Sequence, residues 1–202
     1  MQSLRKFLMM QTDQTSTFDE TPYRAFLYDF FGDFFRGVHD ETWRTRWQDA
    51  LTVTNALCDE TVHVALPDEM TIAKAFARLF YGVGPSTVPL AQSCWENEQS
   101  LHCGDACRKT HDLYARHGLV NDCADHLPDD HIGIVLPFAA HLLREGKVED
   151  LHQLIVGGVC LWWPHAEALL RTKEEWQSLA PILTTFSRFL SYEQNLLTDN
   201  AS

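Results

Sequence analysis

A short run late in the chain, Leu127-Pro128-Asp129-Asp130-His131, gathers side chains that could do chemistry. Carboxylates beside a histidine could hold a metal ion for hydrolysis, or they could pair with the guanidinium group of a cationic ligand. Pro128 ends an irregular stretch, so we expect the acidic residues and the histidine in the first turn of a helix. Acidic residues there also cap free amides and suit the helix dipole, which is an ordinary structural role. The run therefore predicts a polar patch that binds a ligand rather than one that reacts with it.

A second cluster combines cysteine with histidine. Cys103, Cys107 and His111 follow one another at intervals of four residues, which would place them on one helix face. Structural zinc normally has four ligands, and only three lie on this face, while helical cysteines are often small buried hydrophobes. A cysteine–histidine nucleophile pair is conceivable, but no cysteine stands at a strained turn beside a base. We therefore predict no metal site, no cofactor and no catalytic residue.

The overall charge limits the partners of this protein. Acidic residues outnumber basic ones by 28 to 16, which gives a formal net charge of −12. A protein that binds nucleic acid needs a basic face for the phosphates, so this balance argues against that class. Long-range attraction instead favours basic partners, including cationic peptides.

The compartment is predicted from the cysteines and the apolar segments. Six cysteines occur without the spacing of a disulfide-stapled secreted domain, so reduced thiols in the cytoplasm are the simpler interpretation. The apolar patch Phe7 to Met10 is too short for a signal sequence, and no stretch approaches the roughly 18 apolar residues of a spanning helix. We expect no stable insertion into a membrane.

Apolar residues recur at spacings of three and four along most of the chain, which predicts an all-α fold. The strongest stripe follows Pro22, which suits the first turn of a helix capped by Thr21. Its members are Tyr23, Phe26, Leu27, Phe30, Phe31, Phe34, Phe35 and Val38. Further helices are expected at 41–57, 68–81 and 99–117, the last closed by Gly118. The loop 82–93 is long for a compact helical domain and is a candidate functional loop.

The second half of the chain continues in helices. One is expected from Pro128 to Gly146, with Pro137 inside it, and others at 148–161, 165–172 and 174–197. We expect Trp162-Trp163-Pro164 to separate two of them and Pro181 to bend the last. No alternating strand, internal repeat or nucleotide-binding glycine motif is present in the sequence. The prediction is a single-domain bundle of about eight to ten helices over 19–202, preceded by a flexible arm at 1–18.

Several short motifs resemble, in order and spacing, those of the TorD/DmsD chaperones, the cytoplasmic maturation proteins of redox enzymes. The resemblance covers roughly residues 20–195. The motifs are Arg78-Leu79-Phe80-Tyr81-Gly82, a proline-bearing loop with Ser93 and Trp95, Gly104-Asp105, Pro128-Asp129-Asp130-His131, and Trp163-Pro164. Leu127 stands where the family has a glutamate, and Ala91 where it has an aromatic residue.

The resemblance implies an all-helical chaperone for the catalytic subunit of a molybdoenzyme. Such a chaperone binds the client's twin-arginine leader, assists folding and cofactor loading before export, and can meet the molybdenum-cofactor machinery. Both monomers and domain-swapped homodimers fit the resemblance. The residues that it assigns to the leader site are Leu79, Phe80, Trp95, Gly104, Pro128, Asp129, Asp130, His131, Trp163 and Pro164. Two alternatives stay open, a chaperone for a leaderless cytosolic metalloenzyme and a metal-dependent hydrolase that uses Asp129, Asp130 and His131.

Overall fold

The computed structural model describes residues 19–38, 40, 42–81, 87–96, 104–122 and 126–199. Within these residues the fold is all-α, as the sequence predicts, and seven helical rods form it. The predicted arm at 1–18 lies outside the described residues. The elements are α2 (Thr21–Phe35), α3 (Trp43–Leu57), α4 (Glu69–Phe76) running into the π-helix η1 (Ala77–Tyr81), the 3-10 turn η2 (Gln92–Cys94), α5 (Asp105–Arg116), α6 (Ile132–Arg144), α7 (Val148–Leu154), the π-helix η3 (Ile155–Val159), α8 (Cys160–Leu170) and α9 (Trp176–Asp199).

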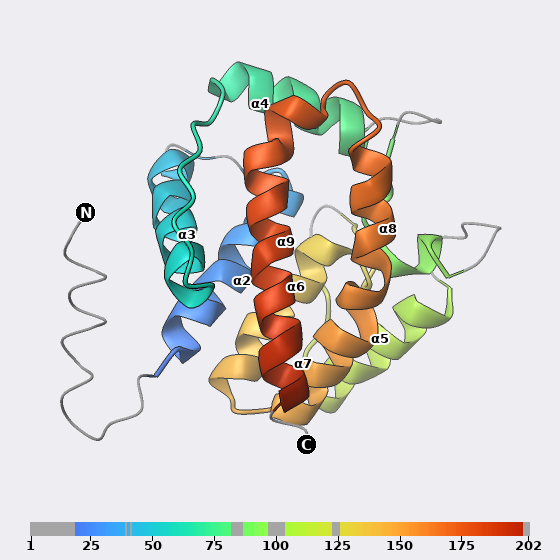
Figure 1. The fold of residues 1–202 in the computed structure, drawn as a ribbon. Helices are drawn as coiled ribbons and strands as arrows, with labels where there is room; N and C mark the ends of the chain where they lie inside the picture. The colour runs from blue at the N-terminus through green and yellow to red at the C-terminus, as the bar shows by residue number, and fades with distance from the viewer. Residues whose placement is uncertain are drawn as a thin grey trace, which may run out of the picture.

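The rods pack around a shared aromatic core, with α9 running through the middle of the view in Figure 1. In that view α3 and α8 flank α9, while α2 and α6 lie behind it. The rod α4 closes one end of the bundle, and α5 and α7 lie toward the other end. The arrangement leaves the loop 87–96 on the side of α6 and α8, where it can meet the start of α6.

The apolar stripe predicted on α2 is the centre of the core. Leu27, Phe30, Phe31 and Phe34 are fully buried. The last side chains of the stripe pack edge to face on α8 and α9, with Phe35 at 5.5 Å from Trp163 and at 5.0 Å from Phe186 between ring centroids. Burial of several aromatic rings at one crossing supplies much of the hydrophobic stabilisation of the fold.

A glycine and a proline let α2 and α6 approach closely. A Cβ atom added to Gly32 would lie 2.6 Å from Cδ of Pro137, so only glycine fits this crossing. Pro137 lies inside α6, as predicted, and its ring occupies the space that the missing side chain leaves. The two residues that weaken a helix in isolation are therefore what allows these two helices to pack.

The expected break at Trp162-Trp163-Pro164 is wrong. The chain stays helical from Val148 to Leu170, with η3 inserted between α7 and α8 and Pro164 inside α8. Pro164 is exposed within α8, and the helix accommodates it there without a break. This continuity also explains why the predicted number of helices is slightly too high.

A buried ion pair fastens the start of α2 to the end of α9. The Arg24 guanidinium donates to both carboxylate oxygens of Glu193, at 2.6 and 2.7 Å, and the Tyr28 hydroxyl donates to the same carboxylate at 2.7 Å. Glu193 is fully buried, so its charge depends on these donors.

In the part of the chain that the structure describes, no helix combines the length and the apolar character needed to cross a bilayer.

Candidate functional site

Two segments far apart in the sequence meet at the start of α6. An antiparallel bridge joins Ala91 to His131, in which Ile132 donates its N–H to the Leu90 carbonyl at 2.8 Å. The Gln92 N–H donates to the Asp130 carbonyl at 3.2 Å. The bridge fixes the predicted functional loop beside the acidic run, so the motifs singled out from the sequence form one region.

The acidic run lies before α6 rather than in its first turn, which corrects the sequence-based expectation. His131 is the N-cap, and its Nδ1 atom accepts the Gly133 N–H at 3.1 Å. The caps expected from the two aspartates are therefore not needed, because the imidazole satisfies this orphan amide. Both carboxylates are available for other partners.

The two neighbouring aspartates have different environments. Asp130 is 1% exposed, and its Oδ2 atom accepts the Ser93 N–H at 2.6 Å, while Oδ1 has no partner among the described residues. Asp129 has a side chain that is 15% exposed and pairs with the exposed His111 ring at 2.8 Å. The Tyr114 hydroxyl donates to the Asp129 carbonyl at 2.9 Å and holds the turn to α5. Asp130 therefore positions the loop, and Asp129 is the carboxylate that a ligand could reach.

His131 is held in its neutral form. Burial disfavours the charged imidazolium and the nearby Arg36 cation disfavours it further, and together they lower the pKa of His131 from 6.5 to about 4. Because Nδ1 accepts a hydrogen bond, the neutral ring carries its proton on Nε2. The Arg36 side chain lies against the start of α6, since a Cβ atom on Gly133 would come within 2.6 Å of the Arg36 Cγ atom.

A cavity of about 340 Å³ opens beside this histidine, and we call it the α6 cavity. It is lined by Phe35, Arg36, Phe80, Tyr81, Leu90, Leu127 and His131. The walls are mostly aromatic and aliphatic, and the polar groups are a guanidinium, a phenol and a neutral imidazole. The Tyr81 hydroxyl donates to the Arg36 carbonyl at 2.9 Å, which joins the end of η1 to the end of α2.

The structure brings some predicted site residues to this cavity and leaves others in supporting positions. Phe80 and His131 line it, whereas Leu79, next to Phe80 in the chain, is completely buried. Trp95 is half-buried, donates its indole N–H to the Pro89 carbonyl at 3.1 Å and stacks on Trp162. The remaining members have the following positions: Pro128 is half-buried in the acidic turn, Gly104 is the N-cap of α5, Trp163 is 2% exposed and Pro164 is exposed on α8.

The predicted site residues do not include five others that line the cavity, namely Phe35, Arg36, Tyr81, Leu90 and Leu127. Arg36 ends α2 just before Gly37, whose φ of +75° turns the chain. Glycine is a common helix stop, so Gly37 could have indicated that Arg36 lies at the end of a helix. Nothing in the local sequence indicated that this end would meet the start of α6, because that contact joins segments about a hundred positions apart in the chain.

The metal and hydrolase hypotheses find little geometric support. Within the described ranges, no three His, Cys, Asp or Glu side chains are grouped as metal ligands would be. Cys103 lies outside the described residues. Asp129, Asp130 and His131 bond to three different partners, namely His111, the Ser93 amide and the Gly133 amide. A hydrolytic centre would direct such groups toward one point.

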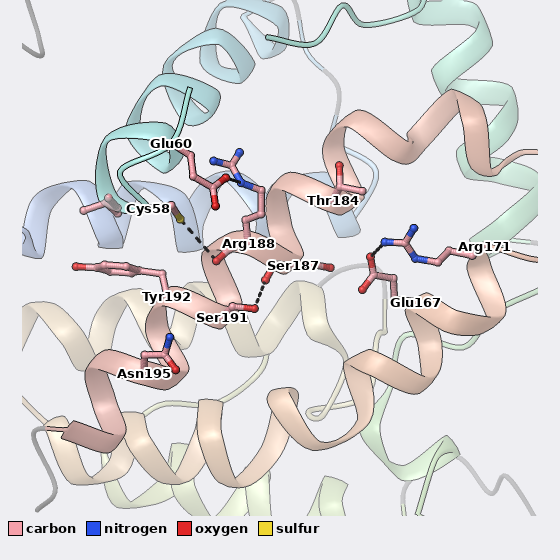
Figure 2. A pocket seen from close by; sticks show the side chains of 11 residues that line it. Cys58, Glu60, Glu167, Arg171, Thr184, Ser187, Arg188, Ser191, Tyr192 and Asn195 are labelled. Atoms are coloured by element: carbon pink, nitrogen blue, oxygen red, sulfur yellow. Dashed lines mark hydrogen bonds and ion pairs between the residues drawn. The ribbon is translucent and has the colours of Figure 1, made fainter. Parts of the chain in front are cut away.

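A second and larger hollow of about 560 Å³ lies between α3, α8 and α9, and we call it the α9 groove. Figure 2 shows Arg188 turned toward Glu60 and Arg171 turned toward Glu167. These two ion pairs have nitrogen–oxygen distances of 2.7 Å each. The remaining lining residues are Leu57, Cys58, Thr184, Ser187, Ser191, Tyr192 and Asn195. None of the site residues predicted from the sequence lines this groove.

The described residues form an all-helical protein with a cavity beside the start of α6. A model of the family described as "Nitrate reductase delta subunit" matches residues 42–157, more than half of the chain. The chain therefore belongs to this family, which is the TorD/DmsD type of chaperone, as the motifs predict.

Two curated relatives carry the name "Tat proofreading chaperone DmsD". The chain is 25% identical over 126 residues to the protein from Salmonella typhi and 26% identical over 124 residues to the one from Salmonella paratyphi A. The aligned parts cover 62% and 61% of this chain. They span only 60% and 59% of the length of those relatives.

Proposed function

We propose that this protein is a cytoplasmic chaperone, and not an enzyme, that binds the catalytic subunit of a molybdoenzyme through its twin-arginine leader. It would assist folding and cofactor loading and delay export until both are complete. The observation that carries the proposal is the Ala91–His131 bridge, because it holds the aromatic loop and the acidic turn together on one side of α6. Membership of a chaperone family and the names of the two relatives support it.

The leader site follows from the chemistry of the two halves of this region. A twin-arginine leader has guanidinium groups followed by an apolar stretch, and carboxylates bind guanidinium in bidentate fashion. Asp129 is the carboxylate that we assign to the guanidinium groups, because its side chain is partly exposed and pairs with the exposed ring of His111. Phe80 and Trp95 are the half-buried apolar side chains that we assign to the apolar stretch, bound as a helix in a groove.

The other predicted site residues would act by positioning these three. Asp130 holds the loop through the Ser93 amide, and Leu79 packs beneath the wall. Gly104 starts α5, the helix that carries His111. Pro128 shapes the turn, and Trp163 and Pro164 lie on α8, whose Trp162 stacks on Trp95.

Calorimetry with a synthetic twin-arginine peptide tests the proposal on the full chain. We expect binding by the wild type, a loss for Asp129→Asn on the order of 1.5–3 kcal/mol, and little change for Glu167→Gln in the α9 groove. A peptide in which glutamines replace both arginines is the matched ligand control. Wild-type affinity in Asp129→Asn, or equal binding of both peptides, would exclude this site.

A further inference from the structure

The carboxylate of Asp129 pairs with an exposed ring on α5. Nδ1 of His111 lies 2.8 Å from Oδ2 of Asp129, and because an ionised carboxylate accepts hydrogen bonds, the imidazole donates its N–H. The side chain of Asp129 is 15% exposed, whereas that of His111 is 61% exposed. The carboxylate therefore has little surface open to solvent, and the ring bonded to it has much.

A guanidinium group needs more room at Asp129 than this arrangement leaves. A bidentate pair uses both carboxylate oxygens, and the planar guanidinium lies edge to edge with them. With so little of the Asp129 side chain exposed, such a pair requires a neighbouring side chain to move. The binding of an arginine therefore depends on which neighbour gives way.

Tyr114 contacts Asp129 too, but it is fixed. It follows His111 by three residues on α5, so both side chains emerge from one face of the helix. The Tyr114 ring is buried and packs edge to face on Phe138, with 4.4 Å between the ring centroids. Its hydroxyl donates to the Asp129 carbonyl at 2.9 Å. Tyr114 therefore holds the backbone of the acidic turn in place, and close packing prevents its rotation.

The His111 ring can leave Asp129 without loosening α5. Most of its side chain is in contact with solvent, so a change of rotamer moves it into water. The helix stays attached through Tyr114 and through His117, whose Nε2 atom lies 2.8 Å from Oδ2 of Asp150 on α7. An exposed pair is weak, so the ring yields to a ligand that forms stronger bonds with the same carboxylate.

We propose that His111 is a gate over the guanidinium site, an internal competitor that an arginine of the ligand displaces from Asp129. The inference deepens the proposed function and rests on it for the identity of the peptide. Removal of the ring should tighten binding, because the carboxylate is then free before the ligand arrives. A residue that contacts the ligand, or that supports the fold of the site, would give the opposite sign.

Calorimetry of the full chain with the twin-arginine peptide measures the effect of removing the ring. His111→Ala should bind about twofold to fivefold more tightly than the wild type, the factor that an exposed ion pair is worth. His111→Gln keeps a donor for Asp129 and should stay closer to the wild type, and His165→Ala, exposed on α8, should match it. In an Asp129→Asn background, His111→Ala should give no gain. Unchanged or weaker binding by His111→Ala, or a gain that persists in that background, overturns the proposal.

A second measurement follows the ring itself and does not depend on the peptide. The NMR signals of the His111 imidazole, identified by their loss in His111→Ala, are recorded while N-acetyl-arginine amide is added to the full chain. We expect saturable shifts toward the positions that these signals have in Asp129→Asn, where the ion pair is absent. Signals that stay at their initial positions throughout the titration overturn the proposal.

The two measurements separate this inference from the proposed function. If the twin-arginine peptide binds the wild type and His111→Ala equally, and the arginine amide leaves the His111 signals in place, the gate is overturned and the leader site stands. If the arginine amide shifts the His111 signals but the twin-arginine peptide binds neither protein, the leader proposal fails and the gate stands.

Discussion

The α9 groove and the α6 cavity differ in the groups that line them. In the larger α9 groove, Arg188 faces Glu60 and Arg171 faces Glu167, so each cation shown there has a carboxylate of the same chain beside it (Figure 2). In the smaller α6 cavity, the described lining combines Arg36 with a neutral histidine and apolar walls. By volume alone, the α9 groove would be the better candidate for a binding site. The difference teaches that the larger hollow is lined by polar groups that already bind one another, whereas the smaller one is walled mostly by apolar side chains next to the predicted motifs.

Trp163 lies between the two hollows, and its removal should have the largest effect. It packs on Phe35 of the α6 cavity, and its indole N–H donates to the Ser187 hydroxyl of the α9 groove at 2.8 Å. Trp163→Ala should lower the free energy of unfolding by about 3–5 kcal/mol, because it opens a void at a buried crossing. Urea denaturation measures this, with Trp163→Phe as the variant that keeps a ring. A loss below 1 kcal/mol for Trp163→Ala would show that the two hollows have no common wall.

Because His131 is neutral in the native state, the stability of the protein should fall as the pH is lowered. Above pH 6.5, the ring is neutral in both states and stability is full; as the pH falls from 6.5 toward 4, the unfolded chain binds a proton that the native state does not. The wild type should therefore lose about 3 kcal/mol over this range through this residue. His131→Asn can still cap α6 but has no ring to titrate. Its stability should therefore fall by about 3 kcal/mol less than that of the wild type over the same pH range. Identical pH profiles for the two proteins would contradict the assignment, and His165→Asn, exposed on α8, is the control.

The two aspartates should separate stability from binding. Asp130→Ala leaves the buried Ser93 amide without its acceptor and should cost about 1.5–3 kcal/mol of stability. Asp129→Ala should cost much less stability and more affinity for the twin-arginine peptide. Thermal unfolding and calorimetry on both variants check this. The reverse order would mean that the reachable carboxylate is Asp130.

The ion pairs of the α9 groove should matter least. A double-mutant cycle on Glu60→Gln and Arg188→Met should give a coupling of about 0.2–1 kcal/mol, because Glu60 is half exposed. Neither variant should change the affinity for the twin-arginine peptide. A tenfold loss in either would move the binding site to the groove.

Local sequence patterns predicted the helices better than the interruptions between them. The stripe on α2 and the stop at Gly118 follow from local patterns, and the structure confirms them. The predicted break at Pro164 was wrong. The local rule that proline interrupts a helix takes no account of tertiary context, and here Pro164 is exposed on α8.

The site was predictable only in part. The motifs named Phe80 and His131 because their types are distinctive, but Arg36 reaches the cavity only through the packing of α2 against α6. The capping role of His131 and the burial of Asp130 likewise depend on the Ala91–His131 bridge. Such long-range pairings leave no periodic trace in a single sequence.

Hydrogen exchange of the full chain with and without a twin-arginine peptide tests the central claim most directly. The account predicts slower exchange in residues 88–96 and in the first turns of α6, with no change in residues 184–195 of α9. Protection confined to α9, or no protection at saturating peptide, would contradict it.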